Sequence, residues 1–282
     1  MAIENSPVMP GLILVFMLVA WGLVSPSLGD DKRIIGGYQT TVEDRPFQLA
    51  LEGAPNGKHT CGASVLATRW ALTAAHCVYN KPLKSLRFRA GTTVRGDGGT
   101  LHPIRFYIYH DLYRTDTLDY DLALVNVKVP FRFGPKIKPI SLPRSPPVEH
   151  ELAIVSGWGY LEKEQLRKPK NLVAAEVYIR SWDDCKKLYP QLTRRMLCAG
   201  EDDIGFCSGD SGGPLTRPNM ELVGIVSWLY NCGDDLPGVY TNVSSMLPWI
   251  TSSLAKYGVY MDMTTKPTVD LNTDSYIIFP SN

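Results

Sequence analysis

The chain has 282 residues, of which 44% are hydrophobic and 20% are charged, and its formal net charge is +1. An apolar fraction of this size can bury a sizeable core in one large domain or in two closely packed halves, which argues against a disordered chain. The balance of charges and the lack of a long Lys/Arg run argue against nucleic acid as a partner.

An apolar segment near the amino terminus predicts export from the cell. Residues 11–24 form an apolar run, and small residues suited to signal-peptidase cleavage follow it at Ser25, Ser27 and Gly29. The run is shorter than the roughly 18 apolar residues of a membrane span. We therefore predict a signal peptide over residues 1–29 and a secreted, extracellular protein without a membrane-bound part. Because Glu4 is acidic and no basic flank precedes the run, an uncleaved signal anchor is the alternative.

Short runs rich in β-branched and aromatic residues, broken by Gly, Pro and Asn, predict an antiparallel all-β protein. Examples are residues 86–90, 104–109, 122–127, 153–156, 172–179, 221–228 and 238–243. The best helix signal covers residues 248–256, where Pro248 would lie early in a short terminal helix. Residues 259–282 are rich in Thr, Asp, Asn and Pro, so we expect a solvated tail there, with a docking segment as the alternative.

Six cysteines follow the apolar run, at positions 61, 77, 185, 198, 207 and 232. In an oxidising compartment an even number of cysteines predicts three disulfides, and the sequence alone leaves fifteen pairings open. Zinc is the competing reading, but the spacings are wide and contain no Cys-x-x-Cys knuckle. Four of the five histidines are dispersed and are expected on the surface or in loops, so no metal site is predicted from them. They are His59, His102, His110 and His150.

Three short motifs supply a histidine, an aspartate and a serine. His76 lies in the segment TAAHC, Asp121 begins the segment DLAL, and Ser211 lies in the segment GDSGGP. Together these side chains are the parts of an activated hydroxyl nucleophile. The chain order His, Asp, Ser is that of chymotrypsin-type enzymes, whereas an esterase with a Gly-x-Ser-x-Gly elbow would have its histidine last.

On these motifs, the chain from Ile34 to about Tyr257 resembles the chymotrypsin-like (trypsin-fold) serine endopeptidases. The resemblance implies a protease domain over residues 34–258. Within it we expect two six-stranded antiparallel Greek-key β-barrels, over about residues 34–145 and 146–246, and then a short C-terminal helix. The cleft between the barrels would hold the functional side chains.

The resemblance also assigns catalytic roles. Ser211 would be the nucleophile, His76 the base that takes its proton, and Asp121 the group that orients the imidazole. The backbone N–H groups of Gly209 and Ser211 would form the oxyanion hole, because glycine leaves its amide open to the substrate. No cofactor and no metal are implied.

An activation site is implied at Arg33. Cleavage after Arg33 by a trypsin-like protease would free the α-amino group of Ile34, which would insert and pair with Asp210. The uncut chain would then be a zymogen with a propeptide of only residues 30–33. An ordinary basic surface turn is the alternative.

The resemblance implies the disulfides Cys61–Cys77, Cys185–Cys198 and Cys207–Cys232. It also implies a substrate pocket formed by Gly205, Phe206, Ser208, Ser227, Trp228, Leu229 and Gly238. Trypsin has an aspartate where this chain has Gly205, so we expect no preference for Lys or Arg. The alternative is that a shifted loop restores an acidic pocket with Asp202 or Asp203, which lie close by in sequence. Phe206 and Leu229 should narrow the pocket, which favours a small or aliphatic residue before the cut bond (P1), with larger apolar residues second.

The sequence therefore predicts a secreted, monomeric serine endopeptidase that is made as a zymogen. Its partners would be protein or peptide substrates, the activating protease, and serpin-type or other inhibitors. The alternative is a non-catalytic homologue that binds a partner. The physiological substrate, the activating protease, the role of the tail and the occupancy of the glycosylation sequon at Asn242 stay open.

Overall fold

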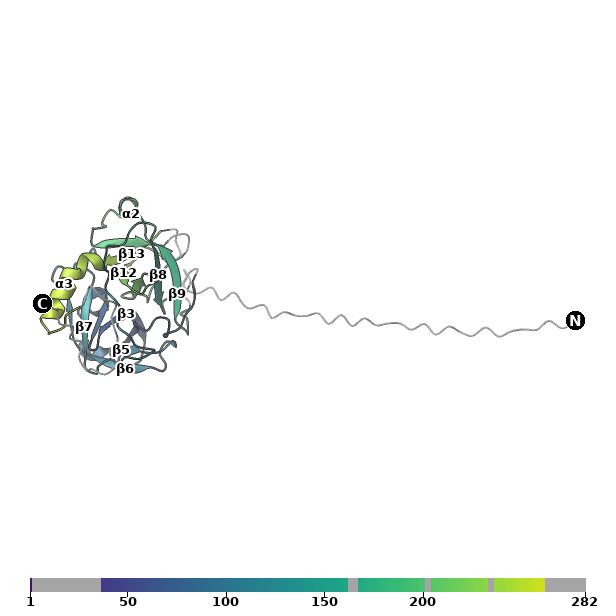
Figure 1. Ribbon diagram of the computed structural model, residues 1–282, viewed down its shortest axis with the longest axis horizontal. Helices are drawn as coiled ribbons and strands as arrows, with labels where there is room; N and C mark the ends of the chain where they lie inside the picture. Colours follow the sequence, from purple (N-terminus) through teal and green to yellow (C-terminus); the bar gives the residue numbers. More distant parts are fainter. Residues whose placement is uncertain (2–36, 162–166, 201–203, 233–235, 262–282) are drawn as a thin grey trace. The chain divides into compact units, whose positions relative to one another are not determined.

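Two antiparallel β-sheets contain most of the secondary structure of the chain (Figure 1). The computed structural model describes residue 1 and residues 37–161, 167–200, 204–232 and 236–261. The predicted all-β class is confirmed, and each predicted run overlaps one strand. The predicted signal peptide beyond Met1, the propeptide and the tail beyond residue 261 lie outside the described residues.

The first sheet is a closed six-stranded barrel. Its strand order is β2-β3-β4-β7-β6-β5. The bounds are β2 (Gln48–Gly53), β3 (His59–Ala67), β4 (Trp70–Thr73), β5 (Leu86–Ala90), β6 (Thr100–Tyr109) and β7 (Ala123–Val127). In β5 burial alternates along the strand, so that Phe88 points into the barrel while Arg87 and Arg89 point outward. Both arginines donate to the fully buried carboxylate of Glu52 on the neighbouring strand, which supplies that charge with partners.

The second sheet has seven strands rather than the expected six. Its order is β1-β9-β8-β11-β12-β13-β10. The bounds are β1 (Tyr38–Gln39), β8 (Leu152–Gly157), β9 (Val173–Tyr178), β10 (Met196–Ala199), β11 (Pro214–Thr216), β12 (Leu222–Trp228) and β13 (Gly238–Asn242). An isolated bridge between Ile179 and Ala199 joins the ends of β9 and β10, so six of these strands curl into the second barrel. Strand β1 is the seventh strand. It precedes the strands of the first barrel in the chain, yet it pairs with β9 of the second sheet.

Helices are few and short, as expected for this class. They are α1 (Ala75–Val78), the 3-10 turn η1 (Leu83–Ser85), α2 (Trp182–Leu188) and α3 (Val243–Ala255). The C-terminal helix starts at Val243 and contains Pro248, so the prediction that it starts at Pro248 was wrong. The side-chain oxygen of Asn242 accepts from the Ser244 N–H at 3.1 Å and caps the helix there, which the apolar pattern alone does not reveal.

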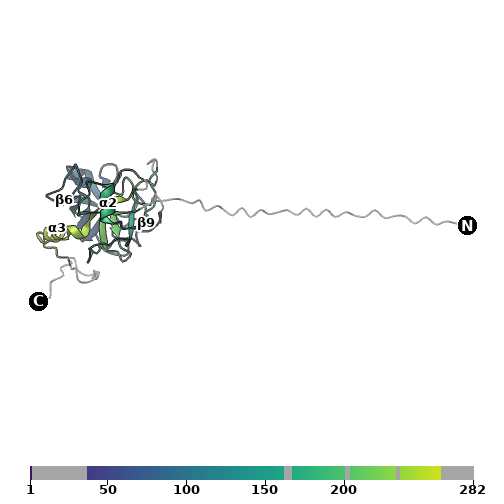
Figure 2. The ribbon, with the colours of Figure 1, turned by 90° about the horizontal axis from the view of Figure 1, so that it is seen from above.

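Helix α3 follows a strand of the second sheet but packs on the first barrel. Its buried side chains Met246, Ile250 and Leu254 belong to the core cluster of that barrel. Just beyond the helix, the Tyr257 ring stands 5.1 Å from the Trp70 ring. Figures 1 and 2 both show α3 beside first-barrel strands. The helix therefore fastens the two halves together, which keeps groups contributed by each half in register.

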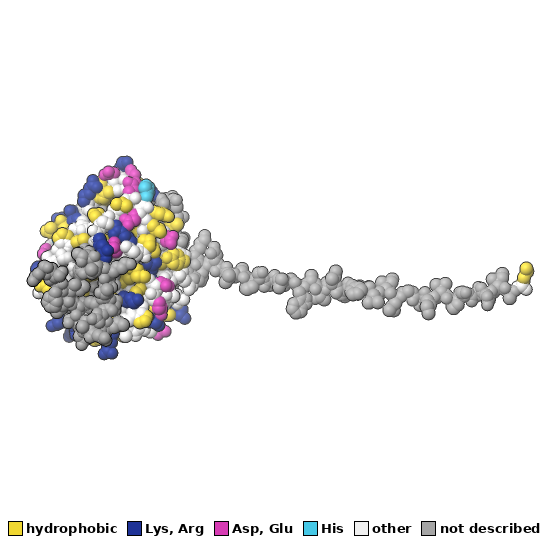
Figure 3. Space-filling view, viewed as in Figure 1, with side chains coloured by type: hydrophobic (Ala, Val, Ile, Leu, Met, Phe, Trp, Pro, Cys, Tyr) yellow, Lys and Arg dark blue, Asp and Glu magenta, His cyan; other side chains and the backbone are white. Residues whose placement is uncertain are grey.

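Charges of both signs are mixed on the face of the molecule that Figure 3 shows. Where residues are coloured in Figure 3, Lys/Arg and Asp/Glu side chains are interspersed rather than gathered by sign. None of the helices within the described ranges is long and apolar enough to cross a membrane.

Candidate active site

His76 and Asp121 meet because two neighbouring strands end at the same edge of the first barrel. Strand β4 pairs with β7 so that Thr73 lies opposite Ala123. His76 follows β4 within α1, and Asp121 immediately precedes Leu122 and β7. The His76 Nδ1 atom lies 2.7 Å from Asp121 Oδ2, and the His76 backbone N–H donates to Asp121 Oδ1 at 2.9 Å.

The Asp121 carboxylate is fully buried and is held from both halves of the chain. The Ser227 hydroxyl, on β12, donates to Asp121 Oδ2 at 2.6 Å. The Thr241 hydroxyl, on β13, donates to the Asp121 carbonyl at 2.7 Å. A buried charge with this many donors is fixed in position. Ser227 was predicted as a pocket residue and Thr241 was not predicted at all, because hydrogen bonds between strands this distant leave no signal in the sequence.

Asp121 also controls the protonation of His76. Burial alone would lower the pKa of His76, but the charge of Asp121 and its hydrogen bond outweigh burial, so the pKa lies above the ordinary value of 6.5. The result is an imidazole whose proton-accepting nitrogen, Nε2, faces away from the carboxylate.

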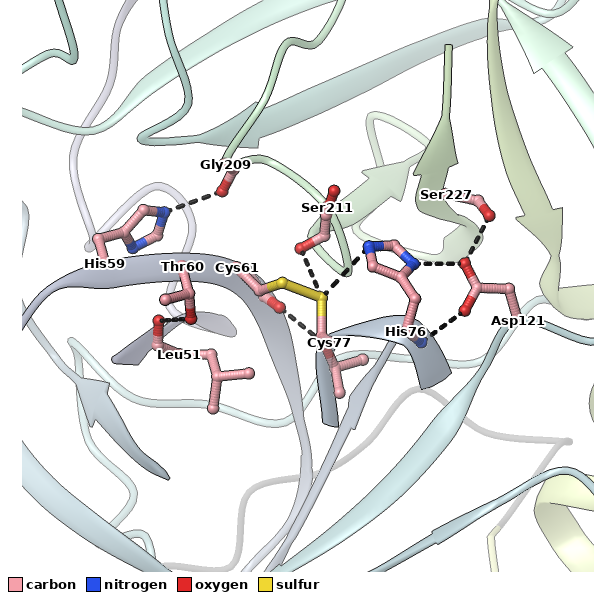
Figure 4. The surroundings of a disulfide bond; sticks show 12 residues. Leu51, His59, Thr60, Cys61, His76, Cys77, Asp121, Gly209, Ser211 and Ser227 are labelled. Atoms are coloured by element: carbon pink, nitrogen blue, oxygen red, sulfur yellow. Dashed lines mark hydrogen bonds and ion pairs between the residues drawn. A yellow bond between two sulfur atoms is a disulfide. The ribbon is translucent and has the colours of Figure 1, made fainter. Parts of the chain in front are cut away.

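Ser211 lies beside the Nε2 edge of His76 (Figure 4). Its carbonyl accepts from the Gly62 N–H of β3 at 2.8 Å, and the next amide, of Gly212, donates to Val226 O at 2.7 Å. These bonds tie the serine loop to one strand from each half. The structure thus brings the three predicted catalytic side chains to one place.

The loop that carries Ser211 has two backbone N–H groups of interest, those of Gly209 and of Ser211 itself. Gly209 has a φ of +102°, a conformation that glycine adopts without strain. Neither the Gly209 N–H nor the Ser211 N–H donates a hydrogen bond within the described part of the chain. Such a pair of N–H groups can receive a developing oxyanion.

His59 stabilises the turn at Gly209 through a hydrogen bond. Its Nε2 lies 2.9 Å from the Gly209 carbonyl. Burial lowers the pKa of His59 to about 3, so the ring is neutral and Nε2–H is the donor. The expectation that His59 and His102 are surface or loop residues was wrong, since both are buried on strands. An isolated histidine in a strand gives no sequence signal of such a contact.

Asp210 is fully buried, and its carboxylate receives two backbone N–H groups, from Gly159 at 2.7 Å and from Cys207 at 3.1 Å. Burial nevertheless raises the pKa of Asp210 to about 6, and the charge of Lys168 only partly opposes this shift. A Cβ at Gly157 would lie 2.1 Å from Asp210 Oδ1, and Gly159 is equally crowded, so only glycine fits there. Arg33 and Ile34 lie outside the described residues.

Phe206 occupies the predicted pocket. A Cβ at Gly238 would meet the Phe206 ring at 2.3 Å, and the ring packs edge-on against Tyr240 at 5.0 Å between centroids. Leu229 packs against the same cluster. A Cβ at Gly205 would meet nothing within 4 Å. Asp202 and Asp203 lie outside the described residues.

Ser208 and Trp228 are the other two predicted pocket residues. The Ser208 carbonyl accepts from the Tyr160 N–H at 3.0 Å. Trp228 packs against Tyr189, with 5.1 Å between ring centroids, and so forms an aromatic wall next to Leu229. Around Gly238 and Leu229 the described side chains are therefore mainly apolar.

The structure contains disulfides between Cys61 and Cys77, between Cys185 and Cys198, and between Cys207 and Cys232, the pairs that the resemblance implies. The first one braces the site, because Cys77 Sγ lies 3.5 Å from the Ser211 carbonyl oxygen. Cys61, His76 and Cys77 are also close enough to hold a metal ion. Both of those sulfurs are already joined to each other, so they are not thiolate ligands.

Comparisons with known proteins agree with this geometry. The family model Trypsin matches residues 34–250. Trypsin epsilon of Drosophila erecta is 36% identical over 225 residues, which are 78% of this chain and 87% of that protein. Trypsin 5G1 of Aedes aegypti is 38% identical over 232 residues, covering 79% and 86% respectively. Transmembrane protease serine 9 of Rattus norvegicus is 36% identical over 256 residues, which are 87% of this chain but 24% of that protein.

A solved structure gives the same result. Mouse neuropsin, described as a serine protease expressed in the limbic system of the brain, superposes with a TM-score of 0.72 and is 32% identical. The match covers 77% of this chain and 98% of neuropsin. The fold, the site and these relatives define a serine endopeptidase. The chain belongs to the trypsin family.

Proposed function

We propose that this protein is a secreted endopeptidase in which Ser211, His76 and Asp121 form the catalytic triad, and that it is made as a zymogen. The observation that carries the proposal is the 2.7 Å contact between His76 Nδ1 and a buried carboxylate, with Ser211 beside the other ring nitrogen. Labelling with a fluorophosphonate after cleavage at Arg33 tests it directly: Ser211 should be modified.

The reaction proceeds through an acyl-enzyme. His76 Nε2 takes the Ser211 hydroxyl proton while Oγ bonds to the substrate carbonyl carbon, and the carbonyl oxygen becomes an oxyanion facing the Gly209 and Ser211 N–H groups. The C–N bond then breaks as His76 gives the proton to the leaving nitrogen. Water attacks the ester in the same way, with His76 again the base, and frees Ser211. Throughout, Asp121 holds the ring and stabilises the imidazolium.

Activation rests on the chemistry of Asp210. In the uncut chain Ile34 carries a peptide nitrogen without charge, and the buried Asp210 carboxylate has a raised pKa. A new ammonium on Ile34 would pair with this carboxylate and order the adjoining Gly209 turn. Secretion follows from the predicted signal peptide over residues 1–29. A signal anchor is the alternative, and the rat relative is itself named a transmembrane protease.

Replacing Arg33 by glutamine should keep the protein in its inactive form. Loss of an ordered oxyanion donor lowers turnover by about 100- to 1000-fold, so the treated R33Q protein should hydrolyse peptides that much more slowly than the treated wild type. The measurement is the hydrolysis rate before and after exposure to a trypsin-like protease, with the new amino terminus identified by mass. Lys32→Gln, which keeps the cleavage site, is the matched control. Full activity of the uncut R33Q protein would contradict the zymogen proposal.

For specificity we propose a small or aliphatic P1 residue, with Phe206 setting the limit. Phe206→Gly would empty the space against Gly238, so the ratio of kcat/KM for P1 Phe over P1 Ala should rise by about 10- to 100-fold. A peptide library cleaved by both proteins measures this, and fluorophosphonate labelling confirms that the variant is folded. Leu229→Gly, a substitution at a less buried position, should widen the same P1 pocket. A wild-type preference for Lys or Arg would overturn the pocket argument.

The Phe206 ring in the predicted P1 pocket also supports a second candidate function. In this candidate the protein is a non-catalytic homologue that binds a partner through its cleft. The buried Phe206 ring favours it, because a triad without room for a side chain would be idle. Absence of labelling at Ser211 in correctly cleaved protein would select this candidate.

A further inference from the structure

A lysine stands directly over the predicted oxyanion turn. The Nζ atom of Lys168 lies 2.6 Å from the point that a Cβ on Gly209 would occupy. The ammonium also lies over the Tyr160 ring, 4.8 Å from its centroid. Lys168 is half-buried. The protein therefore holds a cation next to the place where the substrate carbonyl would sit.

Two further positive charges act on Lys168. Burial is the largest cause of the lowered pKa of Lys168, and the charges of Arg95 and Lys58 lower it further. Arg95 is fixed by its Nε, which donates to the Pro169 carbonyl at 2.9 Å. The three cations come from three separate segments: the turn between β2 and β3, the loop after β5, and the segment before β9. Such mutual repulsion is relieved when an anion binds among them.

Asp210 does not take that role. Among the described residues it is the acidic group whose charge favours protonated Lys168, but its carboxylate is fully buried and accepts from two backbone N–H groups. Under the proposed activation, the Ile34 ammonium would become its partner. The Lys168 charge would then be left for a ligand in the cleft.

The position of these cations fixes which part of a substrate they meet. Figure 4 shows Ser211 between Gly209 and His59 on one side and His76, Asp121 and Ser227 on the other. A substrate peptide can pair as an added antiparallel strand with the backbone that follows Ser227. The residues on the amino side of its cleaved bond then lie on the Ser227 side of Ser211. Its carboxyl side must then leave across Gly209, toward Lys168 and the start of β3.

We propose that Lys168, assisted by Lys58 and Arg95, makes this enzyme select substrates that carry Asp or Glu in the first few positions after the cleaved bond. This inference rests on the proposed function. It concerns the leaving-group side of the cleft and is independent of the P1 pocket.

The test uses the cleaved enzyme and three fluorogenic peptides that are identical except at the second residue after the cut bond, which is Glu, Gln or Lys. Wild type should cleave the Glu peptide with a kcat/KM about three- to tenfold above that of the Gln peptide, and should cleave the Lys peptide more slowly than either. The preference should shrink as salt is raised, because exposed charges are screened.

Lys168→Met should bring the Glu and Gln peptides to within about twofold of each other, and Lys168→Glu should invert the order of Glu and Lys. Lys256→Glu, an exposed lysine at the end of α3, makes the same change in net charge and should leave the wild-type order intact. Using ratios between peptides removes any effect of the substitution on Gly209 itself, since that effect is common to all three peptides.

The outcomes separate the two levels of the argument. If Ser211 is labelled but the three peptides are cleaved equally, or if Lys168→Met keeps the wild-type ratios, this inference is wrong while the proposed function stands. If correctly cleaved protein is neither labelled nor active, the proposed function is wrong and the inference falls with it.

Discussion

Ser211→Ala is expected to lower kcat of the cleaved enzyme by about 10⁶-fold, which is the scale found when the nucleophile of a serine protease is removed. An alanine methyl group cannot bond to the substrate carbonyl carbon, so the acyl-enzyme does not form. The residual rate comes from the open Gly209 and Ser211 amides and from substrate binding. Hydrolysis of a chromogenic peptide with the preferred P1 residue measures the loss, and fluorophosphonate labelling should disappear with it.

Ser252→Ala is the matched control for that variant. Ser252 lies on α3, and its hydroxyl donates to the Trp249 carbonyl of the same helix at 3.2 Å, far from the catalytic motifs in sequence. Its removal should leave kcat within about twofold of wild type. Turnover by Ser211→Ala at a rate close to that of wild type would show that another group is the nucleophile, since no covalent intermediate could then involve position 211.

How much of the fold the sequence predicts depends on the kind of signal each element carries. Strand β5 alternates buried and outward residues, so its pattern predicts it residue for residue, whereas β11 has three residues and offers no pattern. The first barrel closes through pairing between β2 and β5, which are distant along the chain. Closure of that kind is set by packing and not by any local run.

The residues of the site also differ in whether they carry a local sequence signal. His76 and Ser211 could be found because each lies in its own motif, and Asp121 because the chain order fits. The contacts that Ser227 makes with Asp121 and that His59 makes with Gly209 could not be found, because each is one hydrogen bond across the fold. The start of α3 was predicted too late for a related reason: its cap is a side-chain contact at Asn242, which an apolar pattern does not record.

Asp121→Asn is expected to lower kcat by about 10⁴-fold while leaving labelling slow but detectable. An amide at this position can donate toward His76 Nδ1, which favours the tautomer with its proton on Nε2, and that nitrogen can no longer accept the Ser211 proton. Asp116→Asn, a change at an exposed carboxylate that comes shortly before Asp121 in the chain, should leave kcat within about twofold of wild type. Comparing the two variants on one peptide separates the loss of a buried charge from a general effect of removing an aspartate.

The pH profile of the same variant shows how Asp121 acts. Catalysis requires His76 neutral at the start, so kcat/KM rises with pH as His76 loses its proton. In wild type the charge of Asp121 holds the pKa of His76 above 6.5, which places the acid limb of the profile above that pH. In Asp121→Asn the negative charge is gone, whereas burial still disfavours the imidazolium, so the pKa of His76 falls and the acid limb moves to lower pH. An acid limb that stays in place, measured on the residual activity, would mean that the Asp121 carboxylate orients the ring without setting its charge.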